Sequence, residues 1–201
     1  KDSKLVDEIR YKYNENGQVE SEANYNSDNL VFKIFYKYYD NGQKSLKEKY
    51  VDNIRVNSTT YSYHENGQIK AEENYNKDGK LNGKWTEWYE NGKTQYEIYL
   101  KDGKEDGIYT QWHENGQKDT EGNYKDGKRD GKWTVWNENG QIQYEINFKD
   151  SKLVDEIRYK YNENGQKLIK AKFIDNIRVS SSTYSYHENG QIKSEEIYID
   201  G

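Results

Sequence analysis

The chain has 201 residues, a formal net charge of −5 and no cysteine. The missing cysteines exclude disulfides and cysteine-based metal sites, and the balanced charge argues against nucleic acid or an anionic membrane as the main partner. Hydrophobic residues make up only 31% of the chain, but 21 tyrosines, 5 tryptophans and 4 phenylalanines argue against disorder, because aromatic side chains suit a thin, half-buried β-sheet.

From its start, the chain alternates between predicted strands and turns, and every second turn contains an Asn-Gly pair. These pairs recur at steps of 24 or 25 residues. A period of this length fits two strands and two turns, and it is too short for two packed helices. The sequence therefore predicts eight hairpin units, centred on Asn16, Asn41, Asn66, Asn91, Asn115, Asn139, Asn164 and Asn189.

Positions in each unit are counted from this asparagine. Position −3 is always tyrosine or tryptophan, and position +9 is tyrosine, phenylalanine or leucine. We expect Glu-Asn-Gly to form a three-residue loop with its glycine in the left-handed region, so that −3 lies opposite +3 and −5 opposite +5. The second turn is predicted to be a three-residue loop at 125–127 and a four-residue loop at 26–29. This register places Tyr11, Tyr13 and Tyr25 on one face of the sheet.

The predicted fold is all-β, an elongated and twisted single-layer antiparallel β-meander of about sixteen strands. Residues 1–201 are expected to form one continuous repeat array in which each strand contacts only its neighbours in the sequence. Residues 1–18 and 149–166 are identical, which indicates internal duplication. Both ends fall at the same point of the repeat cycle, so we expect an array excised from a longer chain, with edges open to self-association.

Two central segments, 83–93 (GKWTEWYENGK) and 124–133 (YKDGKRDGKW), combine glycine at −8 with tryptophan at −6. They resemble the bacterial variant of the MORN repeat, and the resemblance extends over essentially the whole chain. It is weaker in the outer units, where −6 is Arg10, Thr60, Arg158 or Thr183. The resemblance implies an all-β hairpin repeat without catalytic residues. It also implies a role as a YwqK-type antitoxin or an exported surface protein.

One set of residues departs from the polar character predicted for the second face. Position −6 carries large aromatic side chains at Phe35, Trp85, Tyr109 and Trp133. The last three share their units with a glycine at −8, and they are expected to face Glu97, Glu121 and Glu145 across the hairpin. Two interpretations stay open. The aromatic rings cover gaps at the glycines in the sheet, or they form an exposed stripe with an acidic border that binds a partner.

The sequence offers no constellation for chemistry. The three histidines all occupy −2, beside the Glu-Asn-Gly loops, and a meander would keep them too far apart to share a metal ion. Asp-Gly pairs are explained by turn chemistry without a bound calcium ion. A catalytic pair would be expected to break the repeat, whereas the glutamates recur with it. We therefore expect neither an enzyme nor a cofactor.

The leading hypothesis is a non-enzymatic repeat scaffold that binds another protein, a toxin or a surface or host protein, through one sheet face. The first alternative is an immunity protein that neutralises a partner toxin by direct binding. The second is a carbohydrate-binding module that uses the tryptophans. No apolar run is long enough for a membrane helix, so a membrane partner is not expected. A secreted or cell-surface bacterial protein is favoured, or a cytoplasmic one if the chain is an antitoxin.

Overall fold

The computed structural model describes residues 7–200, and these contain strands and turns but no helix. The strands belong to one open antiparallel sheet of a single layer. The chain divides into two compact units, described separately below. Unit 1 comprises 1–92 with 100–104, and unit 2 comprises 93–99 with 105–201. The all-β antiparallel meander is confirmed, while the prediction of one continuous array stays a prediction.

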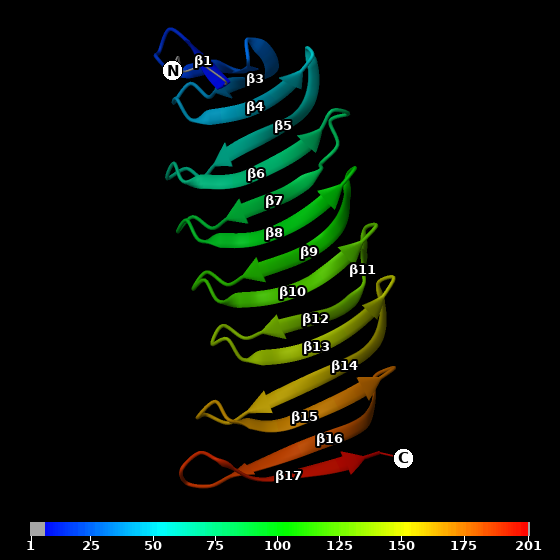
Figure 1. The fold of residues 1–201 in the computed structure, drawn as a ribbon. Coiled ribbons are helices and arrows are strands. Elements are labelled where there is room, and N and C mark those ends of the chain that lie inside the picture. Colours follow the sequence, from blue (N-terminus) through cyan, green and yellow to red (C-terminus); the bar gives the residue numbers. More distant parts are fainter. Residues whose placement is uncertain (1–6, 201) are drawn as a thin grey trace, which may run out of the picture. The chain divides into compact units, whose positions relative to one another are not determined.

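In unit 1, each strand pairs with the next along the chain (Figure 1). Its strands are β1 (Asp7–Tyr13), β2 (Val19–Asn26), β3 (Asn29–Tyr38), β4 (Lys44–Val51), β5 (Ile54–Tyr63), β6 (Ile69–Asn76) and β7 (Gly83–Trp88). Strand β8 (Thr94–Lys101) contains residues of both units.

Unit 2 repeats the same pattern of consecutive antiparallel pairs. Its strands are β9 (Lys104–Trp112), β10 (Lys118–Lys125), β11 (Lys128–Arg129), β12 (Gly131–Trp136), β13 (Ile142–Lys149), β14 (Lys152–Tyr161), β15 (Lys167–Ile174), β16 (Ile177–Tyr186) and β17 (Ile192–Ile199). The described residues hold seventeen strands, against about sixteen predicted, because Asp130 divides one predicted strand into β11 and β12. Gly131 has φ +79°, a conformation that glycine adopts without steric cost.

The Glu-Asn-Gly loops have the predicted form. In the first loop, Gly17 N–H donates to the Asn14 carbonyl over 3.0 Å and Asn14 N–H donates to the Gln18 carbonyl over 2.8 Å. Gly17 has φ +76°, as a type I turn followed by a left-handed glycine requires. Tyr13 lies opposite Val19, which confirms the pairing of −3 with +3.

The predicted pairing of −5 with +5 is wrong. Tyr11 lies opposite Glu22 and Lys12 opposite Ser21, because Glu20 at +4 is an extra residue in a β-bulge. The same shift recurs at Asp119 in the β9–β10 hairpin. A bulge moves every following side chain to the other face, so −5 pairs with +6 and −6 with +7.

The second turns also differ from the prediction. Asn26 pairs with Asn29, and the two residues between them, Ser27 and Asp28, have φ of 46° and 68°. Lys125 likewise pairs with Lys128. These are two-residue loops of type I′, the form whose twist matches the flanking strands. The extra residue of a 25-residue unit lies one step later, as a bulge at Val31 in the β2–β3 pairing.

The bulges decide which side chains share a face. Tyr25 at +9 lies opposite Glu8, on the same face as Arg10, whose guanidinium carbon is 4.3 Å from the Tyr25 ring centroid. The prediction that Tyr11, Tyr13 and Tyr25 share one face is therefore wrong. The side chains at +9 lie on the same face as those at −6. The face that was predicted to be polar therefore carries the aromatic residues of both positions.

Candidate binding surface

In unit 2, the aromatic side chains at −6 and +9 pack against one another. The Tyr109 and Trp133 rings are stacked, with centroids 5.6 Å apart and planes 28° apart. Tyr124 meets the Trp133 ring edge-on at 5.0 Å, and Phe148 does so at 6.3 Å. Trp133 is therefore held on three sides by other rings, in geometries that favour aromatic pairs.

Trp133 lies flat over a glycine of the neighbouring strand. A Cβ atom added at Gly122 would lie 2.1 Å from Trp133 Cδ2, closer than atoms can approach. Trp133 is only 3% exposed, and its Nε1 is buried with no hydrogen-bond partner among the described residues. The predicted glycine partner was Gly131, but a Cβ there would meet nothing within 4 Å. The ring does cover a glycine, but that glycine lies at +7 of the preceding unit.

A small groove of about 220 Å³ opens beside this cluster, and Arg129 is part of its lining. The Arg129 guanidinium carbon lies 4.9 Å from the Trp133 ring centroid and 5.4 Å from that of Phe148. Arginine over an aromatic face is attracted by the ring quadrupole. Arg129 was not predicted as a site residue, and the repeat gave no signal for it, because the equivalent residues of the two preceding units are Leu81 and Glu105.

The predicted acidic border lies on the opposite face. Thr134, and not Trp133, pairs with Glu145, and Thr110, and not Tyr109, pairs with Glu121. The reason is the bulge at +4, which shifts the register by one residue. Glu97 occupies the equivalent position +6 in the sequence.

Glu145 has a distinct environment on that opposite face. Burial raises its pKa, but hydrogen bonds from Lys132 and from the Tyr159 hydroxyl outweigh it, so that the pKa is lowered overall. The Tyr159 hydroxyl lies 2.7 Å from Glu145 Oε2. Glu145 is thus a charged partner within the sheet, because its carboxylate is held by two neighbouring strands.

Unit 1 shows a more open arrangement at position −6. Among the described residues, Phe35 meets the +9 ring of its own hairpin, Tyr50, edge-on at 5.4 Å, and it is 40% exposed. Both rings line a groove of about 440 Å³ together with Leu30 and Phe32. The polar part of the lining is Lys33, Lys37, Glu48, Asp52 and Asn53. Trp85, the other aromatic residue at −6 in this unit, is half-buried.

Two of the four hairpins without an aromatic residue at −6 have arginine in the same place. Arg158 lies over the Phe173 ring at 4.3 Å, as Arg10 lies over Tyr25. Both arginines are held by a glutamate two residues earlier, Glu156 and Glu8, at 2.9 Å between Nε and Oε1. In these two hairpins a guanidinium therefore covers the +9 ring, where other hairpins have an aromatic ring or, at Thr60 and Thr183, a threonine.

This two-strand unit with its glycine loops matches a known family model, the MORN repeat variant. The matched segments, 9–27, 58–77, 81–102, 105–126, 129–150 and 182–200, cover more than half of the chain. The chain belongs to the MORN repeat variant family. The unmatched stretches, 28–57 and 151–181, still form MORN-like hairpins in the structure, β3–β4 and β14–β15.

Solved structures give weaker likenesses. The chain is 11% identical to a chain of the Photorhabdus luminescens Tc holotoxin pore, with a TM-score of 0.32 over 96% of this chain and 12% of that one. It is 12% identical to a protein of unknown function from Bacteroides fragilis, with a TM-score of 0.15 over 96% of this chain and 92% of that one. No curated protein matches.

The face of the MORN sheet opposite to positions −6 and +9 carries a ladder of tyrosines at −5, which was not predicted as a site. Lys44 lies between the −5 rings of consecutive hairpins, with its Nζ 4.6 Å from the Tyr36 centroid and 5.8 Å from that of Tyr61. In unit 2, Lys167 lies in the same way between Tyr159 and Tyr184, at 5.1 and 5.5 Å. The sequence signal was weak, because only two of the five hairpins with tyrosine at −5 have lysine at +3.

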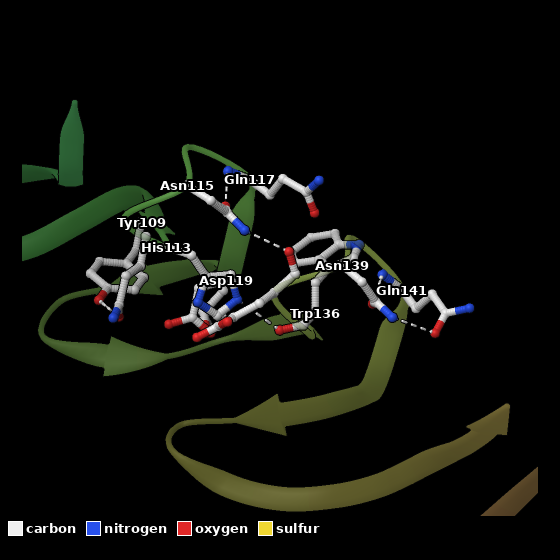
Figure 2. A network of polar contacts seen from close by, with 11 residues as sticks. Tyr109, His113, Asn115, Gln117, Asp119, Trp136, Asn139 and Gln141 are labelled. Atoms are coloured by element: carbon white, nitrogen blue, oxygen red, sulfur yellow. Dashed lines mark hydrogen bonds and ion pairs between the residues drawn. The ribbon is translucent and has the colours of Figure 1, made fainter. Parts of the chain in front are cut away.

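The Glu-Asn-Gly loops of neighbouring MORN units are also joined. Figure 2 shows the network around His113, whose Nε2 lies 3.2 Å from the Trp136 carbonyl and 3.9 Å from Asp119 Oδ1. Asn115 Nδ2 donates to the carbonyl of Glu138 in the next loop over 2.7 Å. In unit 1, His64 makes the equivalent contact with the Trp88 carbonyl at 2.8 Å. These histidines connect loops, and they stay in separate hairpins.

Metal and membrane features can be judged for residues 7–200. Within this range, no three histidine, aspartate or glutamate residues are grouped so that they could hold a metal ion. The same range contains no helix that is long and apolar enough to cross a membrane.

Proposed function

We propose that this MORN repeat chain is a non-enzymatic scaffold that binds another protein through the face carrying positions −6 and +9. The observation that carries the proposal is the groove at Phe35. A large aromatic side chain that is 40% exposed lines a concavity of about 440 Å³ with Leu30, Phe32 and Tyr50. Partly exposed aromatic residues in concave sites are the usual anchors of protein interfaces.

The role of the other −6 residues follows from their burial. Tyr109 and Trp85 are half-buried and present part of their rings on this face. Trp133 is buried, so in this proposal it supports Tyr109 by stacking and does not touch the partner itself. Glu121 and Glu145 lie on the other face, opposite Thr110 and Thr134, and are not part of the proposed contact. The proposed contact in unit 1 therefore centres on Phe35, and a separate contact in unit 2 centres on Tyr109.

The charges around the Phe35 groove define the partner's chemistry. Lys33 and Lys37 lie beside an apolar lining, with Glu48 and Asp52 also present. A partner segment with an apolar side chain flanked by polar groups of both signs fits this mixture. The immunity hypothesis is a narrower form of the proposal in which the partner is a toxin, and a carbohydrate ligand would instead use the rings as stacking platforms.

The test is affinity capture with the intact chain, compared with Phe35→Ser and with Ile177→Ser. Ile177 is 69% exposed and lies outside the groove, so it controls for the loss of an exposed apolar side chain. A partner captured by the wild type and by Ile177→Ser, with affinity reduced at least about tenfold by Phe35→Ser, supports the proposal. Equal capture by both variants removes Phe35 from the interface. Rescue of a host that expresses a captured toxin would support the immunity form.

A further inference from the structure

The Glu-Asn-Gly loops contain a chemically reactive Asn-Gly pair. The hydrogen bonds of the asparagine side chain differ from one loop to another. In an Asn-Gly pair, the glycine nitrogen can attack the asparagine side-chain carbonyl, because no glycine side chain shields it. The pair occurs nine times in this chain. Eight copies lie in the same kind of loop, and the ninth, Asn82-Gly83, lies at the start of β7. A difference in reactivity between the copies therefore has to come from the contacts of each loop.

Two of the loops hold their asparagine amide at both ends. Asn66 Nδ2 donates to the Glu90 carbonyl over 2.8 Å, and its Oδ1 accepts from Gln68 N–H over 2.9 Å. Asn115 makes the same pair of bonds, to the Glu138 carbonyl over 2.7 Å and from Gln117 N–H over 2.8 Å. In both loops the amide is tied to its own loop and to the next one.

In two other loops, the side chain of the Asn-Gly asparagine is not held by hydrogen bonds from the described residues. In the loop of Asn164, residue −2 is Asn162, and its Oδ1 accepts from both Asn164 N–H over 3.0 Å and Gln166 N–H over 2.9 Å. Asn162 thereby accepts the hydrogen bond from the glutamine N–H that the asparagine of the Asn-Gly pair accepts in the loops of Asn66 and Asn115. Among the described residues, the Asn164 side chain forms no hydrogen bond. The loop of Asn16 is built in the same way around Asn14.

We propose that the Glu-Asn-Gly loops are sites of spontaneous deamidation, fastest at Asn16 and Asn164 and slowest at Asn66 and Asn115. The Gly165 nitrogen forms a bond to Cγ of Asn164 and loses its proton, and the Cγ–Nδ2 bond breaks to release ammonia. Water then opens the resulting ring at either carbonyl, which gives aspartate or isoaspartate. The reaction needs no oxidant or enzyme, only water.

The loop contacts act on the first step of this reaction. Gly165 N–H donates to the Asn162 carbonyl over 2.9 Å, and every loop must break its equivalent bond before the nitrogen can attack. Asn66 and Asn115 must also release two side-chain bonds to bring Cγ to the nitrogen. Each net hydrogen bond slows a step about fivefold, which corresponds to ~1 kcal/mol. We therefore expect the tied loops to react at least about fivefold more slowly.

Deamidation changes both charge and geometry at these loops. Each event replaces a neutral amide by a carboxylate and makes the net charge of −5 more negative. The isoaspartate product inserts one methylene group into the main chain and so lengthens the three-residue loop. Gln141 Nε2 donates to the Gly165 carbonyl over 2.8 Å, so a change in the Asn164 loop also disturbs the contact with the loop before it.

The experiment follows deamidation of the folded, full chain over time at mildly alkaline pH by peptide mass spectrometry. The four loops lie in different tryptic peptides, 13–33, 161–167, 56–70 and 105–118. We expect the products at Asn16 and Asn164 to accumulate at least about fivefold faster than those at Asn66 and Asn115. Equal rates in the folded chain, or the reverse order, would overturn the proposal.

Two controls separate structure from local sequence. In concentrated denaturant, the four sites should react at similar rates, and a persistent difference there would assign the effect to sequence alone. The variant Asn162→His gives the Asn164 loop the histidine found at His64 and His113, and it should slow Asn164 towards the tied loops. An unchanged Asn164 rate in a folded Asn162→His variant counts against the proposal. If that variant does not fold, the wild-type comparison still decides.

Discussion

The two units place an aromatic residue at the same repeat position, yet Phe35 is 40% exposed and Trp133 is 3% exposed. The pairing with the preceding hairpin explains the difference. In unit 2, Glu121 at +6 lies opposite Thr134, which places Trp133 beside Gly122 and between the rings of Tyr124 and Phe148.

In unit 1, the register differs by two residues, because Phe35 lies opposite Ser21 at +5, whereas Trp133 lies beside Gly122 at +7. Among the described residues, Phe35 meets one +9 ring, Tyr50, where Trp133 meets two. The register between neighbouring hairpins thus differs between the −6 side chain that is packed into the sheet and the one that is open to a groove. The comparison teaches that repeat position alone does not assign a side chain to packing or to binding.

The largest expected effect tests this contrast directly. Trp133→Ala should lower the free energy of unfolding by about 4 kcal/mol, because it removes a buried aromatic side chain held by three rings. Phe35→Ala should cost only about 1 kcal/mol, because much of that side chain is already in water. Chemical denaturation followed by tyrosine and tryptophan fluorescence measures both. Similar losses for the two variants would mean that the difference in burial has no energetic consequence.

A second variant sharpens the reason for the burial of Trp133. Gly122→Ala should destabilise the chain by about 2 kcal/mol, because the new Cβ would clash with the Trp133 ring and force it out of place. The penalty should largely vanish in the Trp133→Ala background, where the added methyl group has space. Denaturation of the two single variants and the double variant measures this coupling. Additive losses would show that Gly122 matters for its backbone and not for the ring above it.

Much of the fold could be predicted because glycine and asparagine fix the loops. The three-residue Glu-Asn-Gly loop and the pairing of Tyr13 with Val19 follow from the left-handed glycine, which few other residues replace. The type I′ turns could have been predicted too, since Asp126-Gly127 is a favoured pair for them. The assumption that one face continues unbroken through every strand favoured longer loops instead.

The site was harder to predict because the bulges leave little trace in the sequence. The extra residue at +4 is Glu20 in one hairpin and Asp119 in another, and neither type marks a bulge. Without the bulge, Trp133 would face Glu145 on a polar surface. With it, the same residue joins the +9 rings. The sequence could identify the unusual −6 column, but its surroundings depend on a one-residue shift that propensities do not encode.

The smallest effect on stability per residue is expected at the tyrosines of position −5, on the face opposite to −6 and +9. These tyrosines extend the comparison of the two units to the pH dependence of stability. Burial, followed by the charge of Glu22, raises the pKa of Tyr36 in unit 1 to about 12. Burial and the hydrogen bond to Glu145 raise the pKa of Tyr159 in unit 2. A raised pKa in the folded state means that folding favours the neutral phenol. The stabilisation is complete below the unfolded pKa of about 10 and is lost as the pH rises towards the folded value.

The melting temperature should therefore stay constant up to about pH 9 and fall between about pH 10 and 12. Tyr159→Phe provides the matched test, because it removes the ionisable hydroxyl and keeps the ring beside Lys167. At neutral pH this variant should lose a little stability, since Glu145 loses the hydroxyl 2.7 Å away. Above pH 10, its melting temperature should fall less steeply than that of the wild type. Parallel curves would show that Tyr159 does not contribute to the alkaline transition, and the raised pKa of Tyr36 in unit 1 would then have to account for more of it.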